Sequence, residues 1–367
     1  MKKIRHVLGI SGGKDSTALA IFLKQKFPEL DIEYYFCDTG EELNETYQII
    51  ENLEVYLGKK IIRLKAAADT HHSPFEYYLK MYNGFLPSAN ARWCTKNLKL
   101  IPFEQFVADD PVVSYVGIRE DENREAYISK KKNIQSIFPF RKNIWSVDVI
   151  RHVLSESQEN YMLELYRDHL NMNQFIKVEN IIKRPMSFDF NFEKKLLTLL
   201  ECGLIEFNNV VFALLKNTPY PLGRLESFPL LSKTETFGIQ DVFNSLKDSG
   251  IGLPEYYKKI PISSCSLEGV YNRSRSGCYF CFFQQKIEWV WLYEQHPSLF
   301  QKALSFEKEG YSWMDNERLE ELIKPERIRQ IKNDYLKKNN NLKYSSPFLL
   351  DILQEDDEVK ACAACAI

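Results

Sequence analysis

Short apolar runs alternate with stretches of helical periodicity between residue 6 and residue 118. The helical stretch that ends at Leu57 is followed by Gly58, a residue typical of helix ends. This alternation predicts an α/β fold, a doubly wound parallel sheet with helices on both faces and ligands at the carboxyl ends of its strands. The predicted strands span 6–10, 31–37, 60–64 and 112–118, and the predicted helices span 17–27, 44–57 and 96–107.

The alternation stops after residue 154, and residues 155–236 have the pattern of a mainly helical insertion. In it, a helix at 192–202 is closed by Gly203 and followed by a strand-like run at 204–214, an order that also suits a winged-helix-like module. Its basic and acidic residues nearly balance, which favours packing or partner docking over a nucleic-acid face. Four parts are predicted: an α/β nucleotide-binding domain (1–154), the insertion (155–236), a cysteine-bearing loop with C-terminal helices (237–350), and an acidic tail with a Cys-x-x-Cys pair (351–367).

The composition is that of an ordinary globular protein, with 44% hydrophobic and 27% charged residues. No run approaches the roughly 18 apolar residues of a membrane span, and the chain starts without a signal-peptide pattern. We therefore expect a cytoplasmic protein with no membrane partner. The net charge of −2 demands no polyanionic partner. In such a compartment the eight cysteines serve packing, catalysis or metal ligation rather than disulfides.

A glycine-containing string directly joins the first predicted strand to the first predicted helix. It reads Ser-Gly-Gly-Lys-Asp-Ser-Thr at 11–17. Backbone amides of a glycine turn and the amino end of a helix together form a cradle for phosphate. The string is not a Walker A loop, because Gly9 and Gly13 are one residue too close and Asp15 follows Lys14 where Ser or Thr is needed.

The string resembles the Ser-Gly-Gly-x-Asp-Ser signature of the PP-loop ATP pyrophosphatases. The resemblance implies that an acceptor oxygen attacks the α phosphorus of ATP, that pyrophosphate leaves, and that a sulfur or nitrogen nucleophile then displaces AMP. Magnesium neutralises the charge of the leaving pyrophosphate. By the resemblance, Asp15 lies near the magnesium ion and acts in catalysis together with Lys14. The residues expected to hold the pyrophosphate portion are Ser11, Gly12, Gly13, Lys14 and Ser16.

Two further motifs resemble the phosphoadenosine phosphosulfate reductase branch of that family. Asp38-Thr39-Gly40 follows the second predicted strand, where a similar stretch lies beside the nucleotide in this branch; the alternative is a helix-capping turn. Arg-Trp-Cys-Thr at 92–95 resembles a segment found especially in the DNA phosphorothioation enzymes of the branch.

A Gly-Ile-Arg segment begins at Gly117 and resembles the Gly-Ile-Arg-x-x-Glu-x-x-Arg element of the same branch. Arg124 arrives one residue early, which puts its role in question more than that of Arg119. We expect Gly117 to lie at the nucleotide and Arg119 to act in catalysis by stabilising phosphate charge.

Three cysteines, Cys265, Cys278 and Cys281, lie in a predicted loop at 263–281, and Cys94 is the natural fourth member. Four thiolates suit a [4Fe-4S] cluster or zinc, and uncoordinated thiols are the third interpretation. The neighbouring sequence resembles the cluster-bearing end of the phosphorothioation enzymes.

The remaining cysteines have simpler interpretations. Cys202 is expected in the core, and Cys37 is either a persulfide carrier or a buried strand residue. Cys362 and Cys365 either shuttle sulfur or electrons or are inert.

The resemblance favours an ATP pyrophosphatase that adenylylates a phosphate oxygen of DNA, so that sulfur replaces it as a phosphorothioate. The implied partners are nucleic acid, DNA rather than tRNA, a cysteine desulfurase or other sulfur donor, and other subunits of a modification system. A sulfonucleotide reductase is an alternative, although the chain lacks the Glu-Cys-Gly-Leu-His segment of those enzymes. Two more functions stay open at this point: tRNA thiolation and a non-catalytic role as a nucleotide-sensing subunit.

Overall fold

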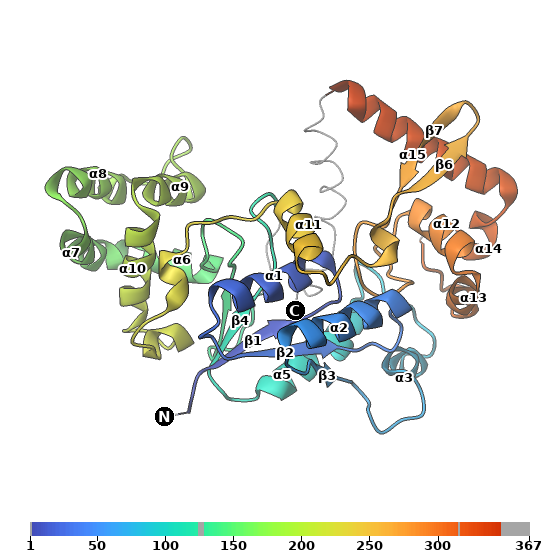
Figure 1. The fold of residues 1–367 in the computed structure, drawn as a ribbon, viewed down its shortest axis with the longest axis horizontal. Helices are drawn as coiled ribbons and strands as arrows, with labels where there is room; N and C mark the ends of the chain where they lie inside the picture. Colours follow the sequence, from blue (N-terminus) through green and yellow to red (C-terminus); the bar gives the residue numbers. More distant parts are fainter. Residues whose placement is uncertain (1, 124–127, 315, 346–367) are drawn as a thin grey trace.

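The computed structural model describes residues 2–123, 128–314 and 316–345. Its centre is a five-stranded parallel sheet in the order β3-β2-β1-β4-β5 (Figure 1). The predicted doubly wound α/β fold is confirmed, because the strand order reverses at β1. The strands are β1 (Arg5–Gly9), β2 (Ile32–Cys37), β3 (Ile62–Leu64), β4 (Val112–Tyr115) and β5 (Ile134–Ile137).

Helices cover both faces of this sheet. Val7 of β1 belongs to a small core with Phe103, whereas the next residue, Leu8, belongs to the large core on the other side. Successive side chains of a strand point to opposite faces, so the two cores mark the two sides of the sheet. The helices that supply them are α1 (Lys14–Lys26) and α2 (Asn44–Leu57) on one side and α5 (Ile101–Val107) on the other.

The sequence pattern does not predict β5. Gln135 and Ser136 interrupt its apolar run, yet both side chains are buried. The Gln135 side chain accepts a hydrogen bond of 3.0 Å from the backbone N–H of Leu222, which belongs to the helical region. The strand is thus completed by a partner from a distant part of the chain.

The strand expected at 204–214 is wrong, because Leu204–Leu215 forms the helix α10. Phe207, Val210 and Val211 are fully buried, and α10 packs against three neighbouring helices. A continuous apolar run cannot be assigned to strand or helix by periodicity alone, and this one is helical because other helices surround it. No strand occurs among the described residues of 155–236, so the winged-helix-like module is not supported.

The helical region extends the large core away from the sheet, and it is drawn mainly in green at the left of Figure 1. In the part of the chain that the structure describes, no single helix has the length and apolar composition of a membrane span; α9 and α10 meet these criteria only together, as a pair bent by 115°. The region comprises α6 (Val147–Val153), η2 (Glu156–Gln158), α7 (Glu159–His169), α8 (Met172–Lys183), α9 (Phe192–Cys202), α10 (Leu204–Leu215), η3 (Pro221–Arg224) and η4 (Pro229–Ser232), and α11 (Ile239–Asp248) follows it and packs on α1.

The C-terminal part builds a second core together with segments from the first hundred residues. The cysteine-bearing region expected as a loop begins as a β-hairpin, whose two strands pair from Ile260–Tyr271 to Ser264–Leu267. Phe75 and Trp93 pack in the same core as Trp289 and Trp313. The elements of this core are α3 (Pro74–Met81), α4 (Trp93–Thr95), η1 (Lys96–Leu100), η5 (Glu255–Tyr257), β6 (Ile260–Ser264), β7 (Leu267–Tyr271), α12 (Lys286–Gln295), α13 (Pro297–Ser305), α14 (Leu319–Leu322) and α15 (Pro325–Ser345).

A buried carboxylate, Glu41, ties this C-terminal part to the sheet. Lys302 of α13 donates to both of its oxygens, at 2.7 and 2.8 Å. Ser73 and Tyr279 donate the other two hydrogen bonds, at 2.6 and 2.8 Å. Three segments far apart in sequence therefore meet at one charge that follows β2.

We expect Glu41→Gln to lower the free energy of unfolding by about 2 kcal/mol, because the change weakens charge-assisted hydrogen bonds at a buried site. Chemical denaturation measures the loss. The matched control is Glu255→Gln, whose exposed pair with Lys258 contributes less than about 0.5 kcal/mol. Equal losses in the two variants would show that Glu41 does not hold the parts together.

Candidate functional site

The predicted phosphate loop lies between β1 and α1, and α1 already begins at Lys14 rather than at residue 17. Gly12 has a φ of 69°, and a Cβ on it would lie 2.5 Å from Cγ2 of Thr46. A Cβ on Gly13 would lie 2.4 Å from Oγ of Ser276. The positive φ and the close Thr46 contact favour glycine at residue 12, whereas a side chain at residue 13 would require the Ser276 hydroxyl to move. The helix α1 follows the loop directly, so its amino end faces the loop as an anion cradle demands.

Hydroxyl groups fix the shape of this loop. The backbone N–H of Ser11 donates to Oγ of Ser16 at 3.1 Å, and the two side-chain oxygens are also 3.1 Å apart. Gly117 lies beyond the end of β4 and lines a cavity that the phosphate loop also lines. A Cβ on Gly117 would lie 3.1 Å from the backbone of Asp15. Glycine at 117 thus lets the two segments approach closely.

Arg119 is almost fully buried, and its guanidinium binds three carboxylates. It lies 2.7 Å from Asp15, 2.8 Å from Asp121 and 2.7 Å from Glu122. Asp15 and Glu122 line the cavity beside the phosphate loop. Arg119 thus holds Asp15 through an ion pair, and the phosphate contact expected from the sequence stays a prediction; Arg124 lies outside the described residues.

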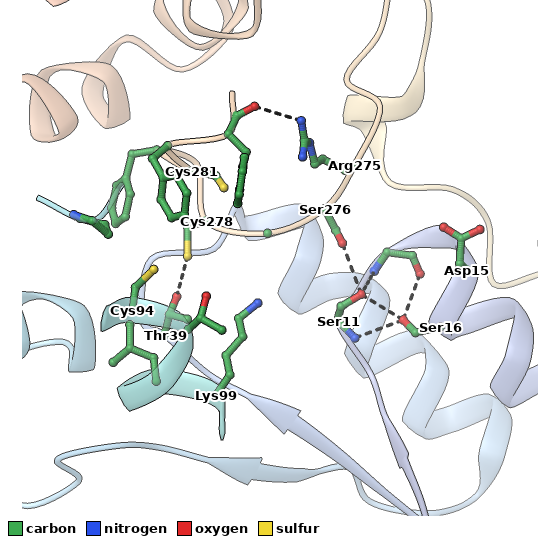
Figure 2. A pocket seen from close by; sticks show the side chains of 18 of the residues that line it. Ser11, Asp15, Ser16, Thr39, Cys94, Lys99, Arg275, Ser276, Cys278 and Cys281 are labelled. Atoms are coloured by element: carbon green, nitrogen blue, oxygen red, sulfur yellow. Dashed lines mark hydrogen bonds between the residues drawn. The ribbon is translucent and has the colours of Figure 1, made fainter. Parts of the chain in front are cut away.

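The phosphate loop lines one cavity together with residues from the C-terminal part (Figure 2). Its wall includes aromatic residues that the sequence analysis did not assign to the site, Phe75, Phe280, Phe282 and Phe283. Arg275 and Ser276 also reach this cavity; the only signal for them is the hydroxyl- and glycine-rich run Ser-Arg-Ser-Gly at 274–277. The polar and thiol-bearing residues of the wall include Ser11, Lys14, Asp15, Ser16, Thr39, Cys94, Lys99, Glu122, Tyr257, Arg275, Ser276, Cys278 and Cys281.

The Asp38-Thr39-Gly40 motif divides between two roles. Asp38 is buried, and one of its oxygens accepts hydrogen bonds from the Gly40 backbone and the Tyr47 hydroxyl, both at 2.9 Å. Asp38 thus closes a local turn, but it does not cap α2, whose N-cap is Leu43. Thr39 does line the cavity, where it donates to Glu42 at 2.9 Å.

The four predicted metal ligands do not come together. Cys94, Cys278 and Cys281 line the cavity (Figure 2), whereas Cys265 is exposed in the turn between β6 and β7. The described residues hold no group of three or more His, Cys, Asp or Glu side chains arranged for a metal ion. The error has a physical source, because strand pairing at 260–271 places Cys265 in solvent. A four-thiolate [4Fe-4S] or zinc site from these cysteines therefore does not fit the structure.

Burial is the main cause of the raised pKa of two of the remaining thiols, Cys278 and Cys37. Burial and the neighbouring Glu42 carboxylate raise the pKa of Cys278 well above its usual value. The Cys278 Sγ lies 3.2 Å from Oγ1 of Thr39 and 3.7 Å from Oε1 of Glu42. Burial also raises the pKa of Cys37 to about 12, and that thiol donates to the backbone oxygen of Lys99. Both sulfurs are thus neutral thiols near pH 7, and Cys37 matches the interpretation as a buried strand residue.

Asp15 and Glu122 give the cavity two carboxylates beside the phosphate loop. Magnesium in nucleotide sites takes oxygen ligands, commonly one or two carboxylates together with phosphate oxygens. The donor set therefore fits a magnesium ion held with the phosphates of a nucleotide.

We expect iodoacetamide at about pH 8 to alkylate Cys265 at least roughly tenfold faster than Cys37 or Cys278, because the thiolate is the reactive form and burial disfavours it. Rates at the buried Cys37 and the half-buried Cys278 rise from about pH 7 to about pH 9 as their small thiolate fraction grows. Peptide mass spectrometry gives the rates, and unfolding in urea should equalise them. Fast labelling of Cys278 in the folded protein would contradict its neutral state.

Several known proteins are similar to part of this chain. Residues 5–143 match the phosphoadenosine phosphosulfate reductase domain. An uncharacterised protein of Methanocaldococcus jannaschii is 33% identical over 153 residues, which is 38% of this chain and 30% of that protein. The tRNA-specific 2-thiouridylases MnmA of Aeromonas hydrophila and Colwellia psychrerythraea are 26% and 24% identical over 137 and 148 residues, covering 33% and 37% of this chain and 36% and 38% of those proteins.

The chain spans about a third of the length of these curated relatives. No solved structure gives a significant match. The domain match begins at β1 and includes the phosphate loop, Asp15 and Gly117. Residues 5–143 are therefore similar to a domain of the phosphoadenosine phosphosulfate reductase and PP-loop family.

Proposed function

We propose that the protein cleaves ATP to AMP and pyrophosphate in order to activate an oxygen of a nucleic acid for replacement by sulfur. One observation carries the proposal: the phosphate loop and the thiols Cys94, Cys278 and Cys281 line the same cavity. Sulfur-bearing side chains in the wall beside the phosphate loop support sulfur transfer over binding of ATP alone.

In this proposal the chain first holds the nucleotide. The amides of the phosphate loop and the amino end of α1 bind the β and γ phosphates. Magnesium, when bound by Asp15 and Glu122 with the phosphates, neutralises the charge of the leaving pyrophosphate. Arg119 keeps Asp15 in place through the 2.7 Å ion pair.

The reaction then proceeds in two displacements. The acceptor oxygen forms a bond to the α phosphorus, and the bond from that phosphorus to the bridging oxygen breaks, so pyrophosphate leaves with the electron pair. A sulfide nucleophile next attacks the atom that bears the adenylylated oxygen, and AMP departs with that oxygen. No oxidant or reductant is needed when sulfide is the sulfur source.

DNA is our first candidate for the acceptor, because the segment 92–95 resembles the Arg-Trp-Cys-Thr stretch of DNA phosphorothioation enzymes. tRNA is the second, because two of the relatives are tRNA-specific 2-thiouridylases. A cysteine desulfurase or another sulfur donor and further modification subunits complete the proposed partners. A cluster held by Cys94, Cys265, Cys278 and Cys281 has no part in the proposal, because Cys265 lies outside the cavity.

We expect wild-type protein with MgATP, acceptor and sulfide to release AMP and pyrophosphate. Asp15→Asn keeps the size of the side chain but removes the charge near magnesium, so turnover falls on the order of a hundredfold or more while ATP affinity changes much less. The exposed Asp109→Asn serves as the matched control and retains activity. Radiolabelled ATP and labelled sulfide, with DNA and tRNA supplied separately, measure both displacements.

Release of ADP and orthophosphate would refute the mechanism, as would full activity of Asp15→Asn. Label in tRNA but not in DNA would assign the acceptor to the second candidate. Sulfite released from a sulfonucleotide would point to a reductase, and binding of ATP without turnover on any nucleic acid would favour a sensing subunit.

A further inference from the structure

The phosphate loop is held from its open side by the C-terminal part of the chain. The Tyr256 hydroxyl donates to the backbone oxygen of Gly12 at 3.2 Å, and the backbone N–H of Lys14 donates to the Tyr257 hydroxyl at 3.3 Å. Lys14 also donates through Nζ to the backbone oxygen of Ser274 at 3.1 Å. The contacts join residues more than two hundred positions apart in sequence. Both the α/β part and the C-terminal part therefore hold the phosphate loop in its shape.

The segment from Asn272 to Gly277, which we call the 272–277 loop, makes the closest approach. The Ser276 hydroxyl lies 3.4 Å from that of Ser11, within the space that a side chain at residue 13 would need. Gly277 has a φ of 119°, a conformation that other residues rarely adopt. The glycine thus favours the turn after Ser276, and the Ser276 side chain points to Ser11 of the phosphate loop (Figure 2).

The two arginines of this loop have different surroundings. Arg273 is almost fully buried, donates to the backbone oxygen of Cys278 at 3.0 Å, and stacks near Tyr256 and Trp291. Its role is to hold the loop together. Arg275 instead lines the cavity, with one nitrogen donating to the backbone oxygen of Phe283 at 3.0 Å.

The charge of a bound triphosphate has to be balanced in this cavity. Lys14, Lys99 and Arg275 are the cationic side chains among its lining residues, whereas Asp15 and Glu122 add negative charge. Nζ of Lys14 lies 3.4 Å from Oδ2 of Asp15, so this carboxylate partly offsets the lysine charge on the phosphate-loop side. A guanidinium presents a planar fork of donors that matches phosphate oxygens two at a time.

We propose that the 272–277 loop is a second phosphate-binding element, in which Arg275 contacts the β and γ phosphates that the phosphate loop holds from the other side. The inference deepens the proposed function, since it assumes that the cavity takes ATP. It assigns part of the nucleotide site to the C-terminal part of the chain, which lies outside the matched residues 5–143.

The test measures binding, without any acceptor, of MgATP, inorganic pyrophosphate and AMP by calorimetry. For Arg275→Gln we expect the affinity for MgATP and pyrophosphate to fall roughly 10- to 100-fold, the range for loss of a charged hydrogen-bonding pair. AMP lacks the β and γ phosphates, so its affinity should change less than about twofold. Arg275→Lys keeps the charge but not the fork and should lie in between.

Arg329→Gln is the matched control, because that arginine is exposed on α15 in the same C-terminal part. Its affinities should equal those of the wild type. Thermal melting checks that each variant is folded, and Arg275→Lys decides the matter if Arg275→Gln does not fold. Unchanged binding of MgATP and pyrophosphate by the Arg275 variants would overturn the inference, as would an equal loss for AMP.

These results are separate from the fate of the proposed function. Wild-type protein that binds ATP through Arg275 but yields no AMP with any nucleic acid would sink the function and leave the second phosphate element standing. AMP formation that does not depend on Arg275 would do the reverse.

Discussion

The shape of the candidate site depends on the close contact between Gly13 and Ser276, two residues that lie more than two hundred positions apart in the sequence. Because a side chain at residue 13 would collide with the Ser276 hydroxyl, the glycine serves the contact with the C-terminal part as well as the curvature of an anion cradle. The phosphate loop is therefore shaped by its own sequence and covered by a segment that the α/β domain does not contain. Glu41 reinforces the same union, with Lys302 and Tyr279 bound to one buried carboxylate.

Local signals made the α/β part predictable. The phosphate loop and the helix ending at Gly58 rest on short-range chemistry, such as glycine turns and helical periodicity, which neighbouring residues fix by themselves. The α10 helix and the strand β5 were not predicted, because both depend on distant segments that pack around them. In β5, the side-chain oxygen of the buried Gln135 accepts its hydrogen bond from the backbone N–H of Leu222. Sequence patterns carry no information on such distant partners.

The candidate site shows the same limit more sharply. The Cys-x-x-Cys spacing correctly placed Cys278 and Cys281 in one loop beside Cys94, but nearness in sequence also suggested Cys265, which strand pairing carries away. Arg119 was recognised as part of the site, yet its three carboxylate partners could be known only from the fold. Spacing thus identified the groups with chemistry, and tertiary packing decided which of them can act together.

Electrostatics link the two halves of the cavity. Burial and Glu42 keep Cys278 as a neutral thiol, whereas the positive charge of Lys99 lowers the pKa of both Cys278 and Glu42. Lys99 lines the cavity that also contains the phosphate loop, so an anionic nucleotide there offsets its charge. The phosphates and burial then both raise the pKa of the Cys278 thiol. Departure of pyrophosphate removes the larger part of that negative charge and restores the effect of Lys99, which offsets part of the rise that burial and Glu42 cause in the Cys278 pKa.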